Sequence, residues 1–107
     1  MKKENINYYD EISQELKESC STYIDELRKT YIEKNRNYGD SFTMSLEDFG
    51  LISAMTRISD KYNRMKNLFK NKDLDPLDEA VDDTMLDMAN YLIMTVAFIR
   101  RKESENE

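Results

Sequence analysis

The sequence has no histidine and no tryptophan, and its 107 residues include one cysteine, one proline and two glycines. Without histidine, and with Cys20 as the one thiol, almost no ligands remain for a typical zinc site. A single cysteine also excludes a disulfide within the chain and favours a reducing compartment. Any metal would therefore be a hard ion held by oxygen atoms, meaning magnesium, manganese or calcium.

Basic residues are fewer than acidic ones, and the formal net charge is −6. This balance argues against binding of a nucleic-acid polymer, which needs a surplus of lysine and arginine, but it leaves room for a local basic patch that binds a small phosphate compound. The N-terminus "MKKENINYYDEI" lacks the apolar core of a signal peptide, and the longest apolar run, "YLIMTVAFI", is too short to cross a bilayer. We expect a cytoplasmic protein with no membrane partner.

Scarce glycine and proline, together with apolar residues spaced by three or four, predict an all-α chain that forms a single domain over residues 1–107. The predicted helices run from about Tyr8 to Asn35, from a capping box at Ser45 and Asp48 to Phe69, and from an N-cap at Asp75 to about Lys102. Gly50 marks a break or bend near the start of the second helix. Residues 103–107 are expected to form a frayed tail.

The third predicted helix is apolar over more than half of its circumference, from Leu77 to Ala97. A helix with so wide an apolar face is usually central and packed on both sides. Three helices cannot easily enclose it, so we expect a bundle of three main helices completed by oligomerisation, as a homodimer or a larger homo-oligomer.

Acidic residues form a stripe on this same helix. At about 100° per residue, Glu79, Asp83 and Asp87 lie on one face with Asn90. The helix dipole explains Glu79, near the N-terminus, but not Asp87, which lies further along between Leu86 and Met88. Two explanations stay open: the three acids hold a metal ion, or they form ion pairs with basic residues of a neighbouring helix.

The segment "RISDKYNR" places Arg57, Asp60, Lys61 and Arg64 on one face of the second helix. Three cations on one face suit either the oxygens of a phosphate or the acids of the third helix. The alternative is a solvated face on which Asp60 bridges the two arginines.

A third candidate element is the loop "KNRNYGDSF". Gly39 permits a tight turn with exposed N–H groups, Lys34 and Ser41 supply donors, and Tyr38 can stack on a base. An ordinary turn at the end of a helix explains the same residues. The three elements together indicate an anionic ligand with a metal.

The segments "KNRNYGDSF", "GLISAMTRISDKYNRMKNL" and "DEAVDDTMLDMANYLIMT" together resemble the nucleotide-modification-associated domain, type one, over about residues 30–96. These small phage and bacterial proteins are similar to the all-α MazG-like nucleoside triphosphate pyrophosphatases, which form dimers or tetramers and use magnesium. The resemblance implies a MazG-like fold and a nucleotide ligand. Its site residues would be metal ligands at Glu79, Asp83 and Asp87, ligand-side groups at Arg57, Lys61, Arg64 and Asn90, and a nucleotide-contacting loop at Tyr38, Asp40 and Ser41. Lys34, a donor of the same loop, completes the set of expected ligand-binding residues.

One feature departs from the MazG-like pattern. Those enzymes carry an E-x-x-E pair on the helix that faces the acids, whereas this chain carries Arg57, Asp60, Lys61 and Arg64. Fewer acids and more bases imply a weaker metal site and a better direct anion site. We therefore expect a nucleotide-binding protein, with three alternatives open: a magnesium-dependent pyrophosphatase, a non-catalytic protein that sequesters a nucleotide such as a signalling nucleotide, or a structural helical module.

Overall fold

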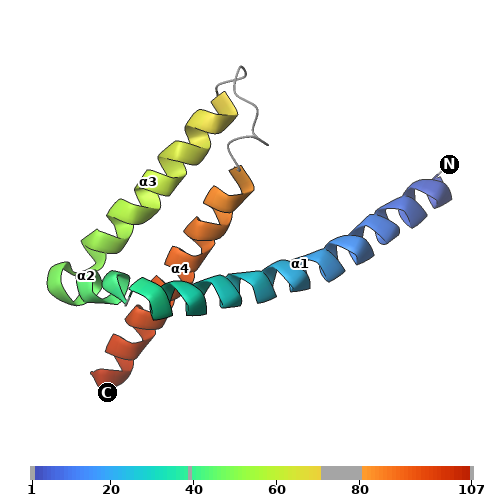
Figure 1. The fold of residues 1–107 in the computed structure, drawn as a ribbon. Helices are drawn as coiled ribbons and strands as arrows, with labels where there is room; N and C mark the ends of the chain where they lie inside the picture. Colours follow the sequence, from blue (N-terminus) through green and yellow to red (C-terminus); the bar gives the residue numbers. More distant parts are fainter. Residues whose placement is uncertain (1, 39, 71–80, 107) are drawn as a thin grey trace. The chain divides into compact units, whose positions relative to one another are not determined.

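The computed structural model describes residues 2–38, 40–70 and 81–106, with side chains from residue 7 onward except at 37–39. The described chain is all helical, and the predicted all-α class is confirmed. Four helices follow in order: α1 (Lys2–Tyr38), α2 (Ser41–Phe49), α3 (Leu51–Lys70) and α4 (Val81–Glu105). Figure 1 shows their course. The three main helices of the prediction are α1, α3 and α4, and α2 is a short addition.

The chain divides into two compact units, Met1–Asn37 and Tyr38–Glu107. The first unit is the body of α1, which contains neither proline nor glycine to interrupt it. Apolar residues at intervals of three and four, among them Leu16, Tyr23 and Tyr31, give α1 an exposed apolar stripe.

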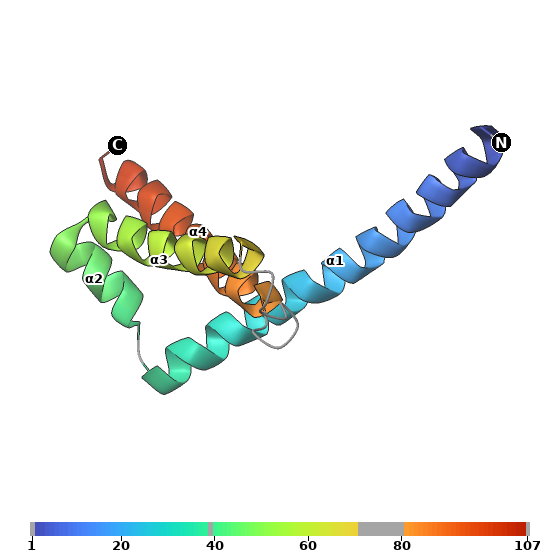
Figure 2. The same ribbon diagram turned by 90° about the horizontal axis from the view of Figure 1, so that it is seen from above.

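The second unit is built on a hairpin of α3 and α4, which lie side by side and run in opposite directions (Figures 1 and 2). The short helix α2 packs against both of them, mainly against α3. Its side chains Phe42 and Leu46 are buried with Ala54 of α3. The partly buried residues that pack against this small core are Ile58, Tyr91, Met94 and Phe98. Leu68 and Thr84 are also buried.

The start of α2 differs from the sequence prediction. Asp40 is the N-cap: its Oδ1 accepts from the Thr43 N–H at 3.1 Å and its Oδ2 from the Thr43 hydroxyl at 2.6 Å. The predicted capping box at Ser45 and Asp48 is wrong, because both residues lie inside α2. A helix begins where a side chain accepts hydrogen bonds from its first free N–H groups. Asp40 does this, five residues before the predicted cap Ser45.

Gly50 separates α2 from α3, as the sequence suggested. Its φ of 77° lies in a region open to glycine, and its N–H donates to the Leu46 carbonyl at 2.9 Å. Its own carbonyl accepts from the Ser53 N–H at 3.1 Å and from the Ser53 hydroxyl at 2.9 Å. One residue therefore ends α2 and begins α3.

The last helix also differs at its ends from the prediction. The predicted N-cap Asp75 lies outside the described residues, and the described part of α4 begins at Val81. At the other end, α4 continues to Glu105, past Lys102 where the sequence predicted its end. None of the helices in the described ranges combines the length and the apolarity that a bilayer-spanning segment requires.

Candidate functional site: a basic groove on α3

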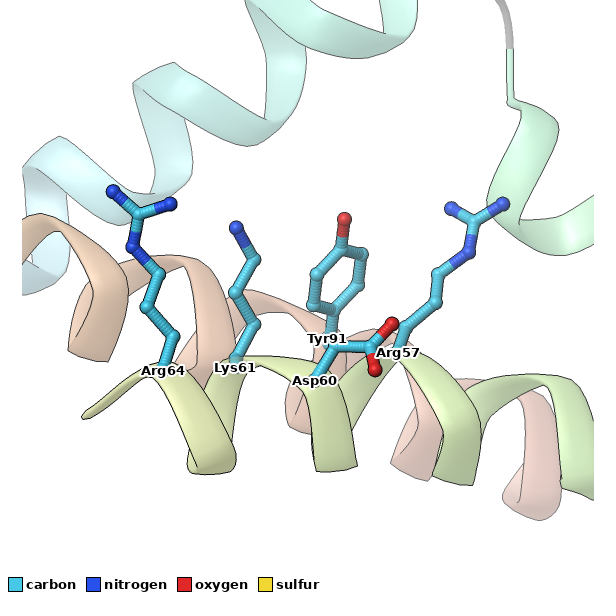
Figure 3. A pocket seen from close by; sticks show the side chains of 5 residues that line it. All are labelled: Arg57, Asp60, Lys61, Arg64 and Tyr91. Carbon is cyan, nitrogen blue, oxygen red and sulfur yellow. The ribbon is translucent and has the colours of Figure 1, made fainter. Parts of the chain in front are cut away.

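An open groove lies along one side of the α3–α4 hairpin. Its volume is about 430 Å³, and the described residues that line it are Arg57, Asp60, Lys61, Arg64 and Tyr91. Figure 3 shows Arg57 and Arg64 at the two ends of a row, with Lys61 and Tyr91 between them and their polar ends directed to the same side. The residues come from α3 except Tyr91, which α4 contributes.

The spacing of the cations follows from helix geometry. Arg57 and Arg64 are seven residues apart, which is two turns or about 10 Å along the axis, and Lys61 lies between them on the same face. The structure therefore brings together the face that the sequence predicted from "RISDKYNR". Asp60 is exposed, and within the described part of the chain no hydrogen bond or ion pair joins it to an arginine.

Arg57 is held in place by its neighbours. Its guanidinium lies over the ring of Phe42, 5.5 Å from the centroid, and over that of Tyr91 at 6.0 Å. The two rings pack against each other with centroids 5.1 Å apart, and Arg57 Nη2 donates to Ser45 Oγ at 3.4 Å. Contacts of this kind fix a guanidinium before a ligand arrives, so less entropy is lost on binding.

Lys61 is tied to the opposite helix. Its Nζ lies 3.3 Å from Oδ2 of Asp87, and both side chains are about one-third exposed. This ion pair lies beside the groove and uses one of the three acids that the sequence assigned to a metal.

The other predicted metal ligands are not assembled into a site. Asp83 is exposed in the first described turn of α4, and Glu79 lies outside the described residues. Among residues 2–38, 40–70 and 81–106, no group of three acidic or thiol side chains is arranged to hold a metal ion. The described acids do not by themselves fit a magnesium site, because Asp87 faces a lysine.

The remaining predicted ligand residues lie at different places. Asn90 is half-buried on α4 beside Tyr91, and Ser41 is exposed at the start of α2. Asp40 caps α2. Lys34 is on α1 in the first unit, and the side chain of Tyr38 lies outside the described set. These positions neither confirm nor contradict the predicted ligand roles.

The sequence prediction missed Tyr91 and Phe42. In the sequence, Tyr91 is the first residue of the apolar run "YLIMTVAFI" and was not considered as a site residue. It lies one turn after Asp87, however, and therefore on the same side of α4. That position was a signal that could have found it. Phe42 carried no such signal, because its contact with Arg57 depends on how α2 packs.

The comparison with family models matches residues 34–99 to nucleotide modification associated domain 1, which covers more than half of the 107 residues. The chain belongs to this family, as the resemblance over residues 30–96 predicted. The groove and the whole of α2 and α3 lie inside the matched segment. The relation to MazG-like enzymes stays a prediction. Comparisons with curated proteins and with solved structures give no match.

Proposed function

We propose that this protein binds a nucleotide in the groove on α3, with the phosphates held directly by Arg57, Lys61 and Arg64. The observation that carries the proposal is the row of three cations on one helix face, one of them already fixed by aromatic contacts. Arginine and lysine are the side chains best suited to phosphate oxygens, and arginine can bind two of them at once. The name of the family agrees with a nucleotide ligand.

The groove also offers groups for the rest of a nucleotide. Tyr91 is half-buried, and Figure 3 shows its hydroxyl directed to the same side as Lys61. A phenol can contact a base with its ring and a sugar hydroxyl with its oxygen. Asp60 supplies the one carboxylate among the described lining residues, and it can accept a hydrogen bond from a base or a sugar. A ligand that contacts Tyr91 and Asp60 as well as the cations needs a base or a sugar in addition to its phosphates.

A non-catalytic nucleotide-binding protein is the form of this proposal that the geometry supports best. Binding through the cations needs no metal, and Asp87 already has a cationic partner in Lys61. Magnesium-dependent hydrolysis is the second candidate, because Asp87 places a carboxylate beside the groove. We also propose the cytoplasm, where nucleotides are abundant, as the place of action.

Isothermal titration calorimetry with mono-, di-, tri- and cyclic nucleotides, each in magnesium and in a chelator, tests the proposal. We expect binding that survives the chelator. Arg64→Glu should lower the affinity by about 10- to 100-fold, which corresponds to the loss of a charged hydrogen bond. Lys66→Glu is the matched control, since it makes the same change of charge on the same helix at a residue whose ammonium lies over Tyr62.

The outcomes separate the candidates. Binding in the chelator that Arg64→Glu removes and Lys66→Glu retains supports the proposal. Binding that requires magnesium, together with release of pyrophosphate from a triphosphate, supports the enzyme instead. Absence of binding to every nucleotide, or equal loss in the two variants, overturns the assignment of the groove.

A further inference from the structure

The three cations of the groove are divided between its two ends. Figure 3 shows Arg64 and Lys61 next to each other at one end of the row and Arg57 at the other end. Tyr91 and Asp60 lie between Lys61 and Arg57 in the same view. The groove therefore has a paired cationic end, a single cationic end, and a middle formed by a phenol and a carboxylate.

The single cation is anchored at its own end. The Arg57 guanidinium lies over the rings of Phe42 and Tyr91, and its Nη2 donates to Ser45 Oγ at 3.4 Å. A guanidinium has several N–H donors, so Arg57 can hold a phosphate while it keeps these contacts. The anchors oppose a movement of Arg57 toward Arg64, which lies about 10 Å further along the helix axis.

The middle of the groove is unsuited to a phosphate. Asp60 follows Arg57 by three residues and precedes Arg64 by four, so it lies between them along the axis, and its side chain is exposed. A carboxylate accepts hydrogen bonds and repels the oxygens of a phosphate. A sugar hydroxyl or an amino group of a base is the kind of donor that Asp60 can accept from.

The two ends carry equal net charge although they differ in their number of cations. Asp87 lies beside the paired end, with its Oδ2 3.3 Å from the Lys61 ammonium. Its negative charge offsets one of the two cations there, so the paired end matches Arg57 alone. Each end therefore suits one phosphate group, and Asp60 separates them.

We propose that the ligand is a nucleotide whose two phosphate groups are separated by its sugar, such as a nucleoside 3′,5′-bisphosphate. The inference rests on the proposed function, which places a nucleotide in this groove. One phosphate binds to Arg57 and the other to Lys61 and Arg64. The nucleoside between them contacts Tyr91 and Asp60.

Asp60 is the residue that selects this class of ligand. The phosphates of a diphosphate or triphosphate share bridging oxygens, so a chain that reaches from Arg64 toward Arg57 brings phosphate oxygens past the Asp60 carboxylate. In a 3′,5′-bisphosphate the sugar occupies that interval and offers a hydroxyl in place of a charge. Repulsion of the wrong ligand contributes to specificity as much as attraction of the right one does.

Isothermal titration calorimetry on the full chain, in a chelator, tests this inference with pairs of isomers. Adenosine 3′,5′-bisphosphate and adenosine 5′-diphosphate have the same base and the same number of phosphates, and they differ in where the second phosphate is attached. The two guanosine isomers repeat the comparison with a second base. We expect the bisphosphate of at least one pair to bind about tenfold more tightly than its isomer, or better.

Asp60→Asn tests the role of the carboxylate. The affinity for the 5′-diphosphate should rise by about 3- to 10-fold, and that for the bisphosphate by less than about twofold, so the preference falls. Asp48→Asn is the matched control, because it makes the same change at an exposed acid of α2 outside the groove. It should leave the ratio of the two affinities unchanged.

Arg57→Gln tests the single end. Without Arg57, the second phosphate should contribute nothing, so the variant should bind the bisphosphate about as tightly as it binds the better of the 3′- and 5′-monophosphates. Arg64→Gln should reduce the advantage of the bisphosphate in the same way from the other end. It serves as the second test if circular dichroism shows that Arg57→Gln, which loses its contacts with two rings, does not fold.

The failure of this inference differs from the failure of the proposed function. If the wild type binds none of the nucleotides, both are overturned. If it binds a 5′-diphosphate as tightly as the bisphosphate isomer, or more tightly, for both bases, nucleotide binding stands and the inference is overturned. A preference for the bisphosphate that Asp60→Asn and the folded arginine variants leave unchanged also overturns it, because the two phosphates are then held elsewhere.

Discussion

The ammonium of Lys61 lies 3.3 Å from Oδ2 of Asp87, and this ion pair joins α3 to α4 beside the basic groove. Asp87 was the acid that the helix dipole could not explain, since it lies past the first turn of α4. The structure gives it a cationic neighbour from the facing helix. Since both side chains are about one-third exposed, solvent screens the pair and limits its contribution to about 1 kcal/mol or less.

Asp87→Asn is expected to strengthen nucleotide binding measured in a chelator. The substitution removes a carboxylate that competes with phosphate for Lys61, so the affinity should rise by up to about fivefold while the free energy of unfolding falls by less than about 1 kcal/mol. Calorimetry and urea unfolding measure the two quantities. Asp83→Asn is the control, because Asp83 is an exposed acid on the same helix. Loss of binding by Asp87→Asn in the chelator would show instead that the Asp87 carboxylate contacts the ligand.

Tyr91→Leu is expected to weaken nucleotide binding more than Tyr91→Phe does. Leucine removes the ring that lies beneath the Arg57 guanidinium, an interaction worth about 0.5–2 kcal/mol, whereas phenylalanine keeps the ring and removes the hydroxyl alone. The affinity should fall by about 3- to 30-fold for leucine. Titrations of both variants at one salt concentration measure this. Equal losses would mean that the hydroxyl, and not the support of Arg57, is what matters.

The fold was largely predictable because its causes are local. Two glycines and one proline allow few turns, which favours long helices. The apolar residues at three- and four-residue intervals then indicate where α1, α3 and α4 lie in the sequence. The start of α2 was missed because two capping signals compete within a few residues. The chain uses Asp40 with Thr43 in preference to Ser45 with Asp48, which brings Phe42 into the core.

Only the part of the candidate site that lies on a single helix could be predicted from the sequence. Arg57, Lys61 and Arg64 share a face by their spacing alone, so the sequence revealed them. The contacts of Arg57 with Phe42 and Tyr91 join three helices, and they depend on packing that no spacing rule provides. For the same reason the choice between a metal and a lysine as the partner of Asp87 needed the position of α3 against α4.

Asp40→Ala is expected to lower the free energy of unfolding by about 1 kcal/mol, whereas Asp40→Ser should keep most of it. The carboxylate accepts two hydrogen bonds from Thr43 at the start of α2, and a serine hydroxyl can accept the one from the N–H. Urea unfolding at one protein concentration measures the difference, since dimerisation would make stability depend on concentration. Nucleotide binding by Asp40→Ser should equal that of the wild type. A stable Asp40→Ser that has lost binding would support the ligand contact predicted from the sequence.

Gly50→Ala is expected to destabilise the protein although the site has room for a methyl group. An added Cβ would have no atom within 4 Å, so crowding by neighbouring residues is not the cause. The cause is the backbone: φ is 77° and ψ is −167°, a combination that only glycine adopts readily and that costs other residues about 1–3 kcal/mol. Asparagine tolerates left-handed helical geometry but not this region, so Gly50→Asn should lose as much stability as Gly50→Ala.

Thermal and urea unfolding of both variants measure the loss of stability. Ser59→Ala, on the exposed side of α3, is the control and is expected to change stability by less than about 0.5 kcal/mol. Full stability in Gly50→Ala would mean that the junction between α2 and α3 adopts another conformation at little cost.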